Sequence, residues 1–193
     1  MNYRFYRIIK FIFKPLFKII FNPKVEGLDN IPKEGRVILA GNHKSNLDAL
    51  IMIYAPNRIV HMMAKKELFS NFVTKWFFKS MCCISVNRNI HDEDAKKQAL
   101  DVLNNDEVLG IFPEGTVNRT NSVLLKLKYG AVSFASKTNS KIVPFSLTGS
   151  YKKRSIKIKF GEPYKVSNDL EKENKILYDK IKELIEGEIW NYI

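Results

Sequence analysis

The chain has 193 residues, 45% of them hydrophobic and 27% charged, which argues against a globally disordered protein and leaves little room for a second domain. Its 32 lysine and arginine residues outnumber the 20 acidic residues and give a formal charge of +12. A charge of this size indicates a polyanionic partner, which is nucleic acid, an anionic lipid surface or an acidic carrier protein.

The N-terminal segment, residues 1–22, combines many aromatic and aliphatic side chains with cations and has no acidic residue. The cations fall within about 120° of a helical wheel, and hydrophobic side chains cover roughly the opposite half. These cations are Arg4, Arg7, Lys10, Lys14 and Lys18. Because a cation interrupts every third or fourth position, the pattern fits neither a membrane span nor a signal peptide. It predicts an amphipathic helix that lies in an anionic membrane surface.

The alternative for this segment is a basic helix that packs its apolar face on its own domain. We divide the chain into a membrane-association segment, residues 1–22, and a folded domain, residues 23–193. From Val25 onward, short β-branched runs alternate with helix-like stretches, which predicts an α/β domain.

The predicted strands span residues 36–40, 58–63, 83–86, 108–112, 141–147 and 156–160. The predicted helices span residues 47–54, 67–79, 92–104, 127–137 and 170–190. The adjacent cysteines, Cys82 and Cys83, suit neither a disulfide with each other nor a zinc site. We therefore expect them to be small core residues in a reduced setting, and no metal site is predicted.

A polar segment, residues 41–48, follows the first predicted strand of the domain, and functional sites gather at strand ends in α/β sheets. On one continuous helix, His43 and Asp48 would point about 140° apart, whereas a turn that enters a helix brings them together. Asp48 would then orient the imidazole of His43 as a general base. Since the chain has no Gly-x-Ser-x-Gly elbow, we expect His43 to activate a hydroxyl of the substrate. The alternative is an ordinary helix-capping pair.

A second polar cluster, residues 112–120, follows another predicted strand. Glu114 can accept hydrogen bonds from substrate hydroxyls, Gly115 lets a ligand approach the backbone, and Arg119 can hold phosphate. Arg88 lies at the end of a third strand and is a further candidate for phosphate binding. The alternatives are an ordinary surface turn and a solvated arginine.

Taken together and in this order, these clusters resemble the four motifs of the 1-acylglycerol-3-phosphate acyltransferase family, over residues 25–148. The matching residues are Asn42, His43, Ser45 and Asp48 in the first motif, Arg88 in the second, Phe112, Pro113, Glu114, Gly115 and Thr116 in the third, and Val143 and Pro144 in the fourth. Val117 stands where many members have an arginine, and Asn87 stands where an acidic residue is common.

The resemblance implies a glycerophospholipid acyltransferase-like fold, in which a mixed sheet is flanked by helices and holds an acyl-chain tunnel beside a charged acceptor site. It implies transfer of a fatty acyl group from acyl-CoA or acyl-acyl carrier protein to 1-acylglycerol 3-phosphate, forming phosphatidic acid without a cofactor. His43 would act as the base and Asp48 would orient it. The residues implied in acceptor binding are Glu114, Gly115, Thr116, Arg88 and Arg119.

The expected location is the cytoplasmic face of the cell membrane, with peripheral or monotopic attachment. Two alternatives stay open. One is a different acceptor, either glycerol 3-phosphate or another lysolipid, because Val117 replaces an arginine. The other is a nonenzymatic basic module that binds membranes or nucleic acid, although no nucleic-acid motif accompanies the charge and no nucleic-acid partner is expected.

Overall fold

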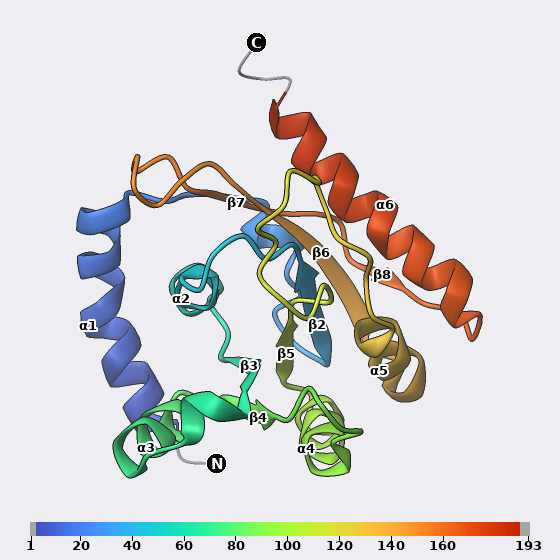
Figure 1. The fold of residues 1–193 in the computed structure, drawn as a ribbon, viewed down its shortest axis with the longest axis horizontal. Coiled ribbons are helices and arrows are strands. Elements are labelled where there is room, and N and C mark those ends of the chain that lie inside the picture. The colour runs from blue at the N-terminus through green and yellow to red at the C-terminus, as the bar shows by residue number, and fades with distance from the viewer. Residues whose placement is uncertain (1–2, 190–193) are drawn as a thin grey trace.

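Eight strands form one mixed sheet in the computed structural model, which describes residues 3–189 (Figure 1). The strands are β1 (Lys24–Glu26), β2 (Val37–Gly41), β3 (Val60–Lys65), β4 (Ile84–Val86), β5 (Val108–Ile111), β6 (Lys141–Thr148), β7 (Lys157–Phe160) and β8 (Tyr164–Lys165). Their order is β1-β7-β6-β2-β5-β3-β4, and β8 also pairs with β6. The strands from β2 to β6 run parallel to one another, whereas β7 and β8 run antiparallel to β6.

Helices cover both faces of this sheet (Figure 1). They are α1 (Arg4–Phe21), α2 (Asp48–Tyr54), α3 (Phe72–Ser80), α4 (Glu93–Asn104), α5 (Gly130–Thr138) and α6 (Leu170–Ile189), with the short 3-10 helices η1 (Leu28–Asn30) and η2 (Lys66–Phe69). Residues of α4, α5 and α6 pack into the core on one face, and residues of α1 and α2 pack into the core on the other. The predicted α/β class, with a mixed sheet flanked by helices, is confirmed.

The predicted strands are all present, with small shifts of their bounds. The helix predicted over residues 67–79 is instead divided into η2 and α3, because Asn71 starts a new helix by accepting a hydrogen bond from the Thr74 N–H at 2.9 Å. The sequence pattern does not predict β1 and β8, since strands of three and two residues carry almost no periodicity. The predicted end of the last helix, at residue 190, lies outside the described residues.

The central strand β2 positions the functional site. All five of its residues are buried, as expected for a parallel strand with helices on both faces. Successive side chains point to opposite faces, so Leu39 contacts the core beneath α1 and α2, and Ile38 contacts the core beneath α4, α5 and α6. Because β2 pairs in parallel with both β5 and β6, the segments that follow β2 and β5 meet at one edge of the sheet.

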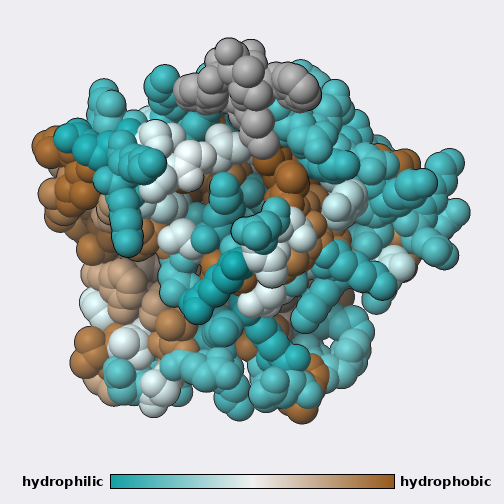
Figure 2. Space-filling view, turned by 45° about the horizontal axis from the view of Figure 1, so that its top comes forward, coloured by the Kyte–Doolittle hydropathy of each residue, from teal (hydrophilic) through white to brown (hydrophobic). Residues whose placement is uncertain are grey.

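The N-terminal helix α1 divides its apolar surface between the protein core and the outside. Tyr6 and Phe17 are buried, and the Phe17 ring lies 5.1 Å from the ring of Tyr54 in α2. The outer hydrophobic side chains are exposed, and they are Ile8, Phe11, Ile12, Leu16, Ile19 and Ile20. Figure 2 shows hydrophobic side chains along the left side of the molecule, where α1 lies. Packing on the domain therefore accounts for only one side of α1.

Within residues 3–189, no helix combines the length and apolarity needed to cross a membrane. The division of the chain at residue 22 stays a prediction. Both cysteines carry free thiols in a small cluster with Tyr6 and Met81. Burial raises the pKa of Cys82 to about 11 and that of Cys83 to about 12, so both thiols are protonated at neutral pH.

Candidate active site

The turn between β2 and α2 brings His43 and Asp48 into contact. We call the two residues the dyad, and residues 42–47 the dyad turn. The strand ends at Gly41 and α2 begins at Asp48, so the residues between them form the predicted turn instead of a continuous helix. His43 Nδ1 lies 2.9 Å from Asp48 Oδ2, and the two side chains are buried or nearly so. Because an ionised carboxylate only accepts hydrogen bonds, the His43 proton resides on Nδ1 and Nε2 carries the lone pair of a base.

Asp48 is fully buried, and its carboxylate is surrounded by donors. Besides the imidazole, Oδ2 accepts hydrogen bonds from the backbone N–H groups of Lys44, at 2.6 Å, and Ser45, at 2.8 Å. Oδ1 accepts one from the Tyr151 hydroxyl at 2.9 Å. Asp48 therefore joins the turn to the imidazole of His43. Its backbone donors precede α2, and α2 has no side-chain cap, so the structure does not show the helix-capping alternative.

Tyr151 is a residue that sequence reasoning missed. It follows β6, 103 positions after Asp48, and its ring is buried. Burial and the neighbouring Asp48 charge raise the pKa of Tyr151, so the hydroxyl remains a donor at neutral pH. The ring also contacts Phe21, the last residue of α1, with ring centroids 5.4 Å apart. Tyr151 thus links the N-terminal helix to the carboxylate of Asp48.

The Phe112 ring fixes the plane of the imidazole. It stacks on the His43 ring with centroids 4.1 Å apart and an interplanar angle of 9°. Stacking and the bond to Asp48 together restrict rotation of the imidazole, and this restriction is what a positioned base requires. Phe112 was singled out by the sequence only as part of a motif, and the role of its ring comes from the structure.

Glu114 holds two loops together. Its Oε1 accepts a hydrogen bond from the His43 N–H at 2.6 Å, and its Oε2 accepts one from the Leu125 N–H at 2.9 Å. Burial raises the pKa of Glu114, and the two backbone donors oppose that rise. The predicted contact of Glu114 with substrate hydroxyls stays a prediction. In this structure one carboxylate oxygen accepts from the backbone at His43, and the other accepts from the backbone of the loop at Leu125.

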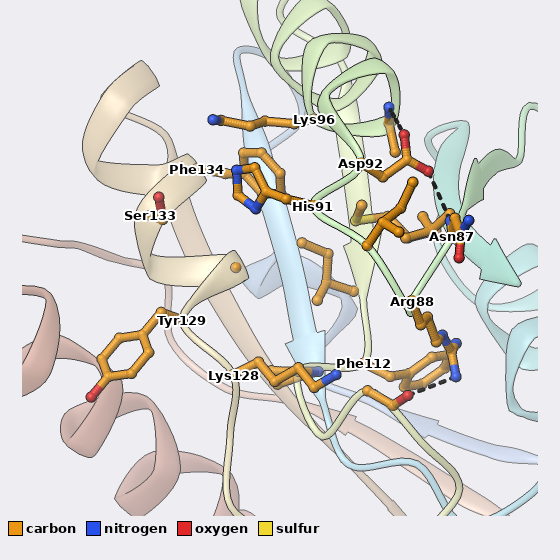
Figure 3. A pocket seen from close by; sticks show the side chains of 18 of the residues that line it. Asn87, Arg88, His91, Asp92, Lys96, Phe112, Lys128, Tyr129, Ser133 and Phe134 are labelled. Atoms are coloured by element: carbon orange, nitrogen blue, oxygen red, sulfur yellow. Dashed lines mark hydrogen bonds between the residues drawn. The ribbon is translucent and has the colours of Figure 1, made fainter.

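Two cations approach the loop at Gly115 from different directions (Figure 3). Arg88 Nη1 donates a hydrogen bond to the Gly115 carbonyl at 2.6 Å, and burial lowers the pKa of this arginine. Lys128 lies so near that a Cβ on Gly115 would stand 2.8 Å from its Cε and 3.0 Å from its Nζ. Gly115 also has φ of +72°, a conformation that favours glycine.

Lys128 was not singled out by the sequence. Its backbone N–H donates a hydrogen bond to the Pro113 carbonyl at 2.8 Å. This bond brings the segment before α5 back to the loop that contains Gly115. Arg88, Gly115 and Lys128 line one cavity of about 460 Å³ between α4 and α5 (Figure 3). Apolar side chains such as Met63 and Phe134 also line it. The cavity therefore offers an apolar wall beside a cationic rim.

The predicted acceptor residues are only partly brought together. Arg88 and Gly115 are in contact, and Glu114 lies between Gly115 and the dyad turn. Thr116 and Arg119 are exposed and do not line the cavity. Their predicted role in acceptor binding stays a prediction. In the described part of the chain, no group of three or more His, Cys, Asp or Glu side chains is arranged to hold a metal ion.

A buried His–Asp pair beside a cavity with an apolar wall and a cationic rim is typical of enzymes that use a histidine as a general base. The Acyltransferase family model matches residues 22–148, and the chain belongs to this family. It is therefore an acyltransferase, and the resemblance seen in the sequence is confirmed.

Similar proteins support this assignment. The 1-acyl-sn-glycerol-3-phosphate acyltransferase of Bacillus subtilis is 33% identical over 151 residues, which cover 72% of each chain. The protein of the same name from Borreliella burgdorferi is 36% identical over 125 residues, 64% of this chain and 50% of its own length. Among solved structures, the 1-acyl-sn-glycerophosphate acyltransferase PlsC from Thermotoga maritima superposes with a TM-score of 0.78 at 26% identity, covering 94% of this chain and 78% of its own.

Proposed function

We propose that this acyltransferase moves a fatty acyl group from an acyl thioester to the free hydroxyl of 1-acylglycerol 3-phosphate, forming phosphatidic acid. The observation that carries the proposal is the 2.9 Å contact between His43 and Asp48 beside the cations at Gly115. The names of the Bacillus and Borreliella relatives support this choice of acceptor. The donor is acyl-CoA or acyl-acyl carrier protein, and the basic surface suits the acidic partner in either case.

The reaction needs one base and no acyl-enzyme. His43 Nε2 removes the proton of the acceptor hydroxyl as its oxygen attacks the thioester carbonyl carbon. The new C–O bond forms, the C–S bond breaks, and the imidazolium returns the proton to the departing thiolate. Asp48 stabilises the imidazolium while it exists and keeps Nε2 facing the acceptor.

Arg88 and Lys128 hold the phosphate of the acceptor. We call Arg88, Gly115 and Lys128 the acceptor rim. A guanidinium and an ammonium on two sides of one glycine can share the oxygens of a phosphate, and glycine lets that group come close to the backbone. Lys128 thereby supplies a cation on a loop where Val117 replaces an arginine common in the family. Glu114, Thr116 and Arg119 belong to the same loop and complete the proposed acceptor site.

The enzyme works at the cytoplasmic face of the membrane as a peripheral or monotopic protein. The exposed hydrophobic side of α1 supports this location, because apolar side chains beside cations suit the boundary between acyl chains and headgroups. The dyad turn leads into α2, and α1 packs on the same face of the sheet as α2. A lysolipid in the bilayer is then near the dyad.

The test is acyl transfer by the purified full chain, with acyl-CoA and acyl-acyl carrier protein, to 1-acylglycerol 3-phosphate, glycerol 3-phosphate and other lysolipids. We expect 1-acylglycerol 3-phosphate to give the highest kcat/KM. His43→Ala should lower it by about 10³-fold, as loss of a general base does. Asn46→Ala, an exposed change in the same turn, is the matched control and should stay active. Undiminished activity of His43→Ala, or preference for another acceptor, contradicts the proposal.

A further inference from the structure

The short helix α3 exposes much of its apolar surface. None of its nine residues is buried, and Phe72 and Val73 are 84% and 71% exposed. Trp76 and Phe77 are 51% and 38% exposed, and Leu68 in the preceding η2 is 44% exposed. A nine-residue helix is marginal on its own in water, and a gathering of large apolar side chains on a surface marks a contact with something else.

This surface is continuous with the exposed side of α1. The Phe5 ring of α1 lies 4.8 Å from the ring of Trp76, in an edge-to-face contact that joins the two helices. Figure 1 shows α3 beside the N-terminal end of α1, on the same side of the molecule. We call the six exposed hydrophobic side chains of α1, together with Leu68, Phe72, Val73, Trp76 and Phe77, the apolar face.

The charges around the apolar face identify what covers it. Neither α1 nor α3 contains an acidic residue, and η2 contains one, Glu67, which is next to Lys66. The exposed lysines beside the apolar side chains are Lys14, Lys18, Lys75 and Lys79. Lysine can bury its stem along apolar surface while its ammonium reaches anionic headgroups. A second copy would bring the same cations and a charge of +12 to the contact, so repulsion opposes it.

We propose that α3 and η2 form a second membrane-inserting element, which joins α1 to seat the protein on an anionic bilayer through the apolar face. This proposal refines the membrane location given under the proposed function, and it rests on that proposed function only for the role of α1. A protein held by one helix in the membrane surface can rotate about the axis of that helix. Contact through two elements fixes its orientation. Phe72 and Val73 enter the acyl-chain boundary, and Trp76 lies at headgroup level.

Trp76 reports insertion directly, because the sequence has two tryptophans and Trp190→Phe leaves Trp76 alone. We expect its emission to shift to shorter wavelength, and its quenching by iodide to fall, when vesicles of phosphatidylcholine and phosphatidylglycerol are added. Vesicles of phosphatidylcholine alone should produce a smaller change. An unchanged spectrum with anionic vesicles overturns the proposal.

A double variant, Phe72→Ser with Val73→Ser, tests the contribution to binding. We expect its partition onto anionic vesicles to fall by about tenfold or more, because two apolar side chains no longer leave water. Its thermal unfolding should match the wild type, since both side chains are already exposed. Val123→Ser, which alters a 42% exposed side chain outside the apolar face, is the matched control and should bind as the wild type does.

Two outcomes separate this inference from its competitors. If light scattering shows a wild-type dimer that the double variant converts to a monomer, a second copy covers α3 and the membrane proposal is wrong. Equal vesicle partition of the double variant and the wild type overturns it as well. The same measurements on His43→Ala should give wild-type binding, so a failure of the proposed reaction and a failure of membrane insertion are distinguishable.

Discussion

The dyad turn and the acceptor rim are neighbours, but they are held in different ways. In the turn, each oxygen of the buried Asp48 accepts a hydrogen bond, and three of the four donors belong to residues 43–45. In the rim, Arg88 and Lys128 are exposed side chains whose stems can move. Short-range hydrogen bonds thus fix the position of the proposed base, whereas the proposed phosphate contacts depend on exposed side chains.

The largest effect is expected at Asp48. Asp48→Asn removes the negative charge that stabilises the imidazolium and allows the wrong tautomer of His43, so we expect kcat to fall by about 10³-fold to 10⁴-fold. Steady-state kinetics measure kcat, and circular dichroism checks that the variant is folded. A folded Asp48→Asn enzyme with more than about a tenth of wild-type kcat would show that Asp48 only caps the turn.

Lys128→Ala should weaken binding of the acceptor and leave the rate of the chemical step nearly unchanged. Loss of one charge-assisted bond to phosphate costs about 1.5–3 kcal/mol, so we expect KM for the acceptor to rise by about tenfold to a hundredfold with little change in kcat. Lys126→Ala, two residues earlier and also exposed, is the control. If Lys126→Ala raises KM as much as Lys128→Ala does, general surface charge and not the rim attracts the acceptor.

Tyr151→Phe removes one hydroxyl from the buried side of the dyad. One oxygen of Asp48 then loses its hydrogen-bond donor, which should lower the free energy of unfolding by about 1–3 kcal/mol and reduce kcat several-fold. Urea unfolding and the pH profile of kcat measure the two effects. The Tyr151 ring still contacts Phe21, so vesicle binding should not change. A variant as stable and active as the wild type would remove Tyr151 from the support of the dyad.

The smallest expected effect is a change in the pH dependence of stability at Glu114. Because burial raises its folded pKa above the ordinary value of about 4.3, the folded state binds the proton more tightly than the unfolded state does. Stability from this group is therefore present below the ordinary pKa and is lost as pH rises through the folded pKa. Relative to Glu114→Gln, the wild type should lose stability from about pH 4 upward, measured by thermal unfolding.

The sequence predicts the parts of the fold that carry strong local patterns. The apolar runs of β2, β5 and β6 and the turn before Asp48 are visible in it, and the structure joins His43 to Asp48 as expected. Tyr151 and Lys128 could not be found in this way. Tyr151 reaches Asp48 only because β6 lies beside β2, and Lys128 reaches Gly115 through a loop that returns to Pro113. Contacts of this kind depend on strand order, which local patterns do not report.

The contact between Phe21 and Tyr151 connects α1 to the catalytic dyad proposed for this enzyme. A helix that only held the protein at a bilayer could be removed, and the remaining domain would still turn over a dissolved substrate. Here the last residue of α1 packs against the side chain that holds Asp48, and Arg154 also donates a hydrogen bond to the Ile19 carbonyl at 2.8 Å. Deleting residues 1–22 should therefore lower kcat in detergent solution as well as the proposed membrane attachment, because α1 also supports Tyr151 and through it Asp48.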